Sequence, residues 1–419
     1  MMDFRRILKI LGPGLLFASM SIGTSHLVLS TKAGAQYGWL MVIPILLANV
    51  LKYPFFEFGV RYTAVTQNTL IQGYKFLGKK YLWLYAFITL ISTFTILAAL
   101  YTVTAGLLIN LFDFQDISIN FVALLLFGFI SAILIIGRYK FLEISLKFIV
   151  SILFVALLIT TVVVFVKGQV TPVEGFVSPE FFDEVGILFI IGLIGWMPTA
   201  VEASGWVSVW TVEKSKSMKD GPSYKEAKQE FDLGYVITAL LAVFFLIIGV
   251  MTLYGTGREL SSSSVQFADQ IVSLFTEHIG NWGYTIIAIA AFSTMFSTCM
   301  TAHDAVSRVS LDILDKLKES DSNQFKSKRA YGLTIVVMTL VNWLVIVAFG
   351  GHMGNLVALA TFVSFVFAPI LGWMNLKTVN SQRFPIENRP NKAIKLLTYL
   401  GIVFLSVFAL YYLFLVVIA

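Results

Sequence analysis

The sequence contains few charged residues and one cysteine. Only 13% of its 419 residues are Asp, Glu, Lys or Arg, about half the share usual in a soluble domain, whereas 58% are hydrophobic. The single cysteine, Cys299, excludes an intrachain disulfide, and no Cys/His cluster has metal-finger spacing. There is no Walker loop, dinucleotide fingerprint or nucleophile–base motif, so the sequence predicts neither an ATP-driven pump nor an enzyme. These absences favour a polytopic helical membrane protein.

Long apolar runs predict eleven membrane spans and their orientation. The approximate bounds are 12–35, 40–66, 82–110, 118–137, 144–166, 186–210, 231–255, 282–307, 331–349, 354–376 and 394–417. With a cytoplasmic amino terminus, 25 of the 30 Lys and Arg fall inside and three outside. This bias predicts an inner plasma-membrane protein, embedded in the lipid bilayer, with an extracytoplasmic carboxyl terminus. It also explains the net charge of +6 as membrane topology rather than nucleic-acid binding.

The first span is interrupted at its centre by small and polar residues. Gly23, Thr24, Ser25 and His26 lie about eleven residues from either end of the stretch 12–38, near the bilayer midplane. Backbone at this depth leaves helical geometry only where it faces protein or a water-filled cavity. The pattern predicts a binding site, with a kink at a helix–helix contact as the alternative.

The sixth span is interrupted in a similar way. Pro198 follows Met197, and Thr199, Ala200 and Glu202 lie near the midplane. Proline removes one helical hydrogen bond and clashes with the preceding turn. Two interrupted spans that lie five helices apart predict an inverted repeat, the arrangement in which secondary transporters bind substrate at the breaks.

We therefore predict an all-α polytopic membrane protein built as a single transporter domain over 1–419. Residues 12–166 would form the first repeat, 186–377 the second, and 394–417 an additional helix. The predicted substrate-binding residues come from the two breaks: Gly23, Thr24, Ser25, His26, Met197, Thr199, Ala200 and Glu202. Because the two breaks occupy corresponding places in the two repeats, we expect His26 and Thr199 to line one cavity. No cofactor is predicted, and the oligomeric state stays open, with a monomer as the default expectation.

The eighth span carries a stripe of hydroxyl side chains. Ser293, Ser297 and Thr301 recur every four residues on one helical face, with Thr298 beside them. Hydroxyl oxygens, together with carbonyls freed by an unwound helix, suit a dehydrated sodium ion, so these four residues are candidates for a coupling-ion site. The alternative is close helix packing, or hydrogen bonds to carbonyls of the same helix.

Ionisable residues in the second span and their absence from the third bear on the coupling ion. Glu57 and Arg61 are four residues apart in the second span and can form an ion pair, and Lys52 lies deeper in the same span. The third span has no acid or base between Trp83 and Leu111, which leaves no carboxylate relay for protons there.

The first and sixth spans resemble those of the Nramp family of divalent-metal transporters. The resemblance rests on the frame GPGLLFAS…AGAQYG within 12–38 and on Met197-Pro198. It implies a LeuT-type fold with broken first and sixth helices, followed here by an eleventh span.

The resemblance also implies that the metal site has been replaced. In the family the first break reads Asp-Pro-Gly-Asn, whose Asp and Asn ligate manganese or iron, but this sequence has Gly23 and His26 at those two positions. The family's Met-Pro-His retains its methionine here as Met197, while Thr199 stands at the histidine position. The acids of the family's third helix correspond to apolar residues around 97–100. None of the family's Asp, Asn or His ligands is therefore present.

These departures favour a secondary transporter for a small anion, such as bicarbonate, coupled to sodium or, second, to protons. Thr24, Ser25, His26, Thr199 and backbone amides would donate hydrogen bonds to the anion. Motif-lacking relatives in the family are associated with bicarbonate. The first alternative is a manganese or magnesium transporter that uses Met197, Glu202 and carbonyls. The others are an organic solute, and a sensor or scaffold that binds without transport.

Overall fold

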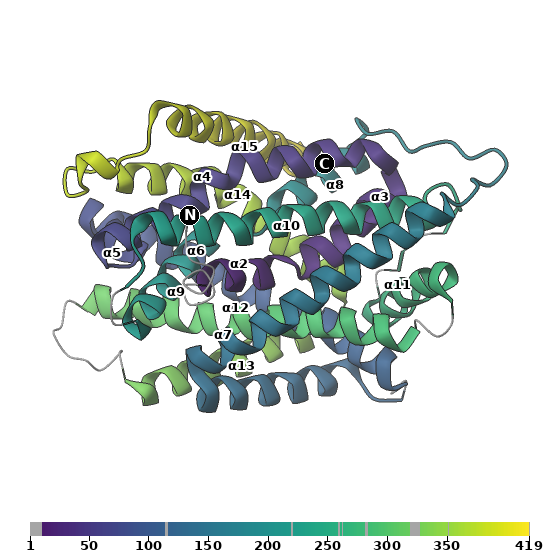
Figure 1. Cartoon of the computed structure of the whole chain (residues 1–419), viewed down its shortest axis with the longest axis horizontal. Helices are drawn as coiled ribbons and strands as arrows, with labels where there is room; N and C mark the ends of the chain where they lie inside the picture. Colours follow the sequence, from purple (N-terminus) through teal and green to yellow (C-terminus); the bar gives the residue numbers. More distant parts are fainter. Residues whose placement is uncertain are drawn as a thin grey trace.

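The computed structural model describes residues 11–418 except 114–115, 219–220, 259, 262, 281–283, 319–326 and 351. These residues form a bundle of helices with no strand among them (Figure 1). In chain order the helices are α2 (Pro13–Ser21), η1 (Ser25–Ser30), α3 (Thr31–Tyr37), η2 (Gly38–Met41), α4 (Val42–Thr66), α5 (Leu70–Leu77), α6 (Lys79–Phe112), α7 (Ile119–Lys167), α8 (Glu184–Trp196), α9 (Ala203–Ser217), α10 (Tyr224–Leu253), α11 (Ser264–Ile279), α12 (Tyr284–Lys318), α13 (Lys328–Ala348), α14 (Met353–Val379), η5 (Ile386–Asn388) and α15 (Lys392–Ile418).

Eight segments of the described chain are helical, long enough and apolar enough to cross a membrane. They are Ser25–Thr66, Lys79–Phe112, Ile119–Gly137, Tyr139–Lys167, Tyr224–Leu253, Lys328–Ala348, Gly354–Val379 and Lys392–Phe414. Of the other predicted spans, the sixth is split into two short helices, α8 and α9, and the eighth is α12, which carries the hydroxyl stripe. The first span is also divided, into α2, η1 and α3.

The fourth and fifth predicted spans are joined in the structure without a loop. Helical structure continues through α7, although the ribbon turns back sharply between its two halves (Figure 1). A Cβ built on Gly137 would lie 2.7 Å from the Cβ of Phe141, far closer than two residues four apart in a straight helix. Both predicted spans are present, but residues 138–143, which lie between their predicted bounds, are helical.

Glycines bring α10 into backbone contact with both parts of the first span. A Cβ on Gly234 of α10 would lie 2.2 Å from the carbonyl oxygen of Gly14 in α2. One on Gly249 would lie 2.2 Å from the carbonyl oxygen of Thr31 in α3. No side chain fits at either place, so helices can approach this closely only where glycine removes the Cβ. These contacts fix the two segments that flank the first break against one continuous helix.

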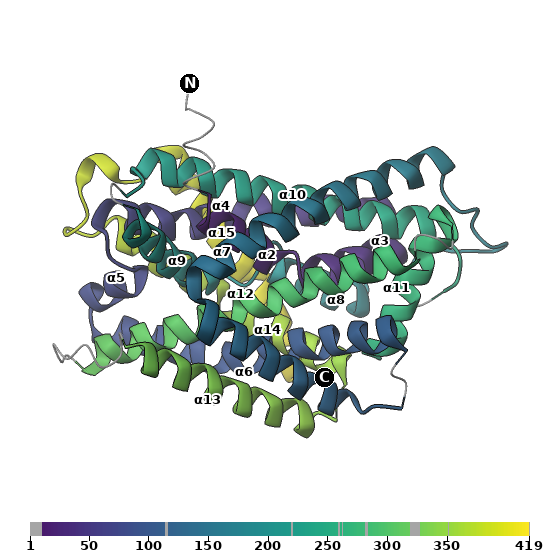
Figure 2. The same ribbon diagram turned by 60° about the horizontal axis from the view of Figure 1, so that its bottom comes forward.

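The outer faces of the bundle are apolar, and its two ends carry different connections. Large side chains such as Ile136, Leu333 and Leu410 are more than 60% exposed, as expected of a surface that faces lipid. Helices α5 and α11 lie at opposite ends of the bundle in both views (Figures 1 and 2), as expected when five of the predicted spans lie between them in the chain. The basic residues of 1–10 lie outside the described residues, and the orientation itself stays a prediction.

Candidate substrate site at the two helix breaks

The first break is a short turn followed by a widened helix. Helix α2 ends at Ser21, a turn occupies Ile22 and Gly23, and the chain continues as the π-helix η1. The amides of His26 and Leu27 both donate to the carbonyl of Gly23, at 3.1 and 3.0 Å. The interruption predicted at the midplane is therefore present, and it is compact rather than extended.

The second break is longer and is not helical. Helix α8 ends at Trp196, α9 begins at Ala203, and the peptide bond between Met197 and Pro198 is cis. The first amides of α9 are already used, because the amide of Ala203 donates to the carbonyl of Ala200 at 3.1 Å. The amides of the next two residues likewise donate to carbonyls of the break. The first three amides of α9 are therefore satisfied by the break itself and are not free to bind a substrate in this conformation.

The two breaks meet in the middle of the bundle. The hydroxyl of Ser25 donates to the carbonyl oxygen of Pro198 at 3.3 Å. Beside this contact lies a small cavity of about 20 Å³, close to the space taken by one water molecule. Its lining comes from the two breaks and from α2, α6, α8, α9 and α12: Met20, Thr24, Ser25, Ile96, Leu100, Trp196, Thr199, Ala200, Trp206 and Ala302.

Two buried polar atoms of this lining have no hydrogen-bond partner in the described chain. They are the hydroxyl of Thr24 and the indole Nε1 of Trp206, in residues that are 1% and 2% exposed. Buried polar groups are nearly always hydrogen-bonded, and an unpaired one costs about 1–3 kcal/mol. An indole N–H can only donate, so it requires an acceptor atom. None of the lining residues is ionisable.

His26 faces away from the cavity. Its Nε2 lies 2.9 Å from the carbonyl oxygen of Thr238 in α10, and its Nδ1 lies 2.7 Å from the hydroxyl of Ser25. The side chain is fully buried, and His26 is not among the cavity-lining residues. The prediction that His26 and Thr199 line one cavity is therefore wrong for His26, because its ring ties the first break to α10.

Three other predicted residues lie behind the cavity wall. Gly23 packs against α12, where a Cβ would lie 2.5 Å from Cγ2 of Thr298. Met197 is fully buried next to the second break, and Glu202, also fully buried, accepts a hydrogen bond from Ser364 at 3.3 Å. The structure thus brings Thr24, Ser25, Thr199 and Ala200 together in the cavity and places these three behind it.

The hydroxyls of α12 are mostly bonded to carbonyls. Ser297 donates to Thr294 at 2.8 Å, and Thr301 donates to carbonyls of its own helix at 2.9 and 3.0 Å, whereas Ser293 is only half-buried. Thr298 differs, because its hydroxyl also donates across the interface to the carbonyl of Ser19 in α2, at 2.7 Å. It is thus the predicted coupling-ion residue that joins α12 to the end of α2.

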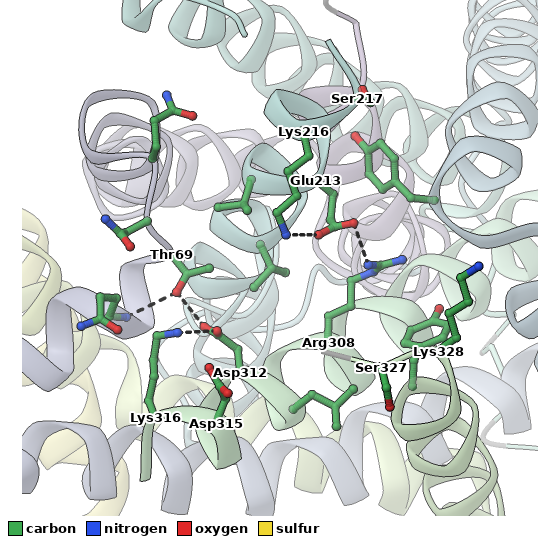
Figure 3. Close-up of a pocket in the computed structure, with 18 of the residues that line it drawn as sticks. Thr69, Glu213, Lys216, Ser217, Arg308, Asp312, Asp315, Lys316, Ser327 and Lys328 are labelled. Atoms are coloured by element: carbon green, nitrogen blue, oxygen red, sulfur yellow. Dashed lines mark hydrogen bonds and ion pairs between the residues drawn. The ribbon is translucent and has the colours of Figure 1, made fainter. Parts of the chain in front are cut away.

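A larger vestibule opens at the end of the bundle predicted to be cytoplasmic. Its volume is about 710 Å³, and charged residues line it (Figure 3). Arg308 lies 3.3 Å from Glu213, which also pairs with Lys216 at 2.8 Å. Asp312 accepts hydrogen bonds from Lys316 at 2.5 Å and from Thr69 at 2.6 Å.

A buried polar layer lies between the vestibule and the cavity. Asp304 accepts hydrogen bonds from Trp210 at 2.9 Å, Arg308 at 2.8 Å and Tyr331 at 2.5 Å, and thereby joins α9, α12 and α13. Along α9 the cavity-lining Trp206 precedes Trp210 by one helical turn. This layer therefore connects the lining of the vestibule, which includes Arg308 and Tyr331, to the helix that carries Trp206.

The comparisons with known proteins agree with this architecture. Residues 14–415 match the model of the Nramp family, described as natural resistance-associated macrophage protein-like. The chain belongs to the Nramp family. The fold and family are those of membrane transporters rather than enzymes. An uncharacterized protein of Pasteurella multocida strain Pm70 is 30% identical over 407 residues, which cover 96% of this chain and 90% of that protein.

Solved structures share the fold at low sequence identity. A mutant of the Eremococcus coleocola manganese transporter has a TM-score of 0.74 and 14% identity, and the match covers 97% of this chain and 86% of that one. A transporter of the nucleobase-cation-symport-1 family, in a closed conformation with bromovinylhydantoin bound, has a TM-score of 0.65 and 11% identity. That match covers 96% of this chain and 91% of that one. The fold is thus the Nramp and LeuT-like transporter fold, with both breaks at its centre.

Sequence reasoning missed the two tryptophans of the cavity wall. Trp196 directly precedes the second break, and Trp206 lies three residues after the start of α9. Aromatic residues are common throughout this chain, at 15%, so composition gave no reason to single them out. Their position at the edges of the break, next to it for Trp196 and within about one helical turn for Trp206, was the available signal.

Proposed function

We propose that this Nramp-family protein is a secondary transporter of a small oxyanion, with bicarbonate as the leading candidate, taken up together with sodium. The observation that carries the proposal is the chemistry of the cavity wall. Trp206 and Thr24, whose indole N–H and hydroxyl have no partner in the described chain, both line a cavity without any ionisable side chain.

This wall suits an acceptor better than a metal ion. A divalent cation needs oxygen, nitrogen or sulfur ligands with lone pairs, and it repels an N–H group. The described residues include no group of three or more His, Cys, Asp or Glu that could hold a metal ion. Leu100 provides an apolar wall near the third-helix positions where the family resemblance placed acids. Burial of an oxyanion here would supply partners to Trp206 and Thr24.

Transport requires that the cavity enlarge. At about 20 Å³ it is too small for bicarbonate. We interpret the structure as a closed conformation that would open when the helices on either side of the breaks move apart. The hydrogen bond between Ser25 and Pro198 is one contact that such a movement would stretch.

We place the coupling sodium ion where α2 meets α12. The carbonyl oxygens of Ser19 and Thr294 lie 2.7 and 3.1 Å from the hydroxyl oxygen of Thr298. Three oxygens from two helices therefore converge, and a small cation would replace the hydrogen bonds of the hydroxyl. The other predicted residues, Ser293, Ser297 and Thr301, would support this helix face.

A divalent cation is the second candidate. Two observations favour it, namely the likeness of fold to a manganese transporter and the buried carboxylate of Glu202 near Met197. Neither side chain lines the cavity, however, so a cation would require these residues to rotate toward it.

The test is uptake by purified protein in proteoliposomes. We expect labelled bicarbonate to accumulate faster with an inward sodium gradient than with a potassium gradient, above the background of protein-free vesicles. Nitrate and formate should compete if the site recognises small oxyanions. Manganese uptake that ignores sodium, with no protein-dependent bicarbonate uptake, would refute the proposal and support the second candidate.

A further inference from the structure

Lys52, in the middle of α4, caps the broken end of α8. Its side chain is fully buried, and its Nζ donates to the carbonyls of Ile194 at 2.6 Å and Gly195 at 2.8 Å. These carbonyls belong to the last turn of α8, which ends at Trp196. The carbonyl of Ile194 also accepts a hydrogen bond from the amide of Met197 at 3.3 Å. The ammonium group therefore meets the negative end of the helix dipole.

Glu202, on the other side of the break, is a fully buried carboxylate with few partners. One oxygen accepts a hydrogen bond from Ser364 at 3.3 Å, and the other has no partner in the described part of the chain. Lys52 also interacts with the carboxylate electrostatically. A buried charge with so few hydrogen bonds needs a compensating charge nearby.

Glu202 is connected to the cavity wall through a hydrogen-bonded chain, and Lys52 bonds to the two residues that precede the cavity-lining Trp196. The cavity-lining Trp196 donates its indole N–H to Ser364 at 3.1 Å, and Ser364 donates to Glu202. The second break thus carries one positive and one negative side chain directly behind the cavity wall, both outside the cavity itself.

We propose that Lys52 is a specificity-determining residue: a tethered cation that neutralises Glu202 and the end of α8, so that the second break binds anions instead of attracting a metal ion. This inference rests on the proposed anion transport and explains its charge selectivity. Without Lys52 the break would hold an uncompensated carboxylate and a negative helix end, which is the electrostatic environment of a cation site. With Lys52 the break is neutral, and the donors of the cavity decide the ligand.

The proposal predicts opposite effects of neutralising each partner. In purified protein, K52M should weaken bicarbonate binding about tenfold, as expected when a unit charge is removed at a distance of about 10 Å in a medium of effective dielectric constant about 20. The same variant should gain binding of Mn²⁺. E202Q should tighten bicarbonate binding. The double variant K52M/E202Q has the same net charge as the wild type, so its bicarbonate affinity should return close to the wild-type value.

Three controls separate charge from folding. K52R keeps the charge and should keep wild-type selectivity. K214M removes another buried lysine, which pairs with Glu143 at 2.8 Å near the predicted cytoplasmic end, and should leave the preference for bicarbonate over Mn²⁺ unchanged. Thermal unfolding of each variant without ligand measures folding. If K52M does not fold, the comparison of E202Q with K52M/E202Q still gives the sign of the effect.

Titration calorimetry with bicarbonate and, separately, with Mn²⁺ decides the outcome. Opposite signs for K52M and E202Q support the proposal. Equal losses in K52M, E202Q and K52R would assign the pair a structural role and overturn it. If the wild type binds no bicarbonate but K52M still gains Mn²⁺, the proposed substrate is wrong and the role of Lys52 in excluding cations stands.

Discussion

Ser25 and Pro198, 173 positions apart, form a hydrogen bond between the two broken helices. The hydroxyl of Ser25 lies 3.3 Å from the carbonyl oxygen of Pro198, 2.6 Å from that of Ser21 and 2.7 Å from Nδ1 of His26. One hydroxyl therefore links the end of α2, the histidine that ties the first break to α10, and the second break. Contacts of this kind couple the two repeats of a transporter, because each break lies on a segment that must move during transport.

S25A should loosen this junction. We expect a loss of about 1–3 kcal/mol of stability, because buried carbonyls and the Nδ1 of His26 lose a partner. Thermal unfolding of S25A and of S151A measures this, since Ser151 is exposed and bonds only to a carbonyl of its own helix. Equal stability of S25A and the wild type would contradict the role given to this contact.

W206F should separate binding from stability. Because the indole N–H of Trp206 has no partner in the described chain, its removal should leave the unliganded protein as stable as before, or slightly more so. Bicarbonate affinity should fall about tenfold, the cost of one hydrogen bond to a charged ligand. W196F is the matched control, because its indole donates to Ser364 and its loss should lower stability instead. Unchanged bicarbonate affinity in W206F would remove the main support for the proposed site.

H26A should act mainly on stability. Loss of the ring leaves the buried carbonyl of Thr238 without its donor, for a cost of about 1–3 kcal/mol. Because His26 does not line the cavity, its effect on bicarbonate affinity should be smaller than that of W206F. Calorimetry measures the bicarbonate affinity of H26A and W206F, and thermal unfolding measures their stability. A larger loss of affinity in H26A than in W206F would indicate that the ring of His26 enters the site when the protein opens.

A charged residue at position 23 can be tested only after its steric conflict with Thr298 is removed. G23A should destabilise the protein by about 1–3 kcal/mol, because its Cβ would lie 2.5 Å from Cγ2 of Thr298. T298A should restore much of that loss. In the T298A background, G23D should bind bicarbonate more weakly than the isosteric G23N, because a carboxylate would stand close to the anion. Stronger bicarbonate binding by G23D than by G23N would contradict an anion site at the breaks.

T298V tests the sodium site. Sodium should raise the unfolding temperature of the wild type, since a ligand that binds only the folded state stabilises it. We expect T298V to lose this response, because valine removes the oxygen that faces Ser19. T301V is the control, since its hydroxyl bonds only to its own helix, and it should retain the response. A sodium response that persists in T298V would place the ion elsewhere.

The sequence by itself determined the class of protein and the position of both breaks. Apolar runs, the distribution of basic residues and two polar interruptions five spans apart do not depend on tertiary contacts, because each follows from the chemistry of a single segment in a bilayer. The sequence also has Gly23 and His26 at the two positions where the family resemblance implies metal ligands.

Only the tertiary structure decided which side chains reach the cavity. Ser25 and His26 are neighbours in sequence but point about 100° apart around the helix axis, so one faces the second break and the other faces α10. No sequence pattern predicted the widened turn of η1. Likewise, Lys52 meets the end of α8 only because α4 packs across it, a contact between residues 142 positions apart. The charge of the second break therefore depends on which helices lie side by side, and the order of residues along the chain does not specify that.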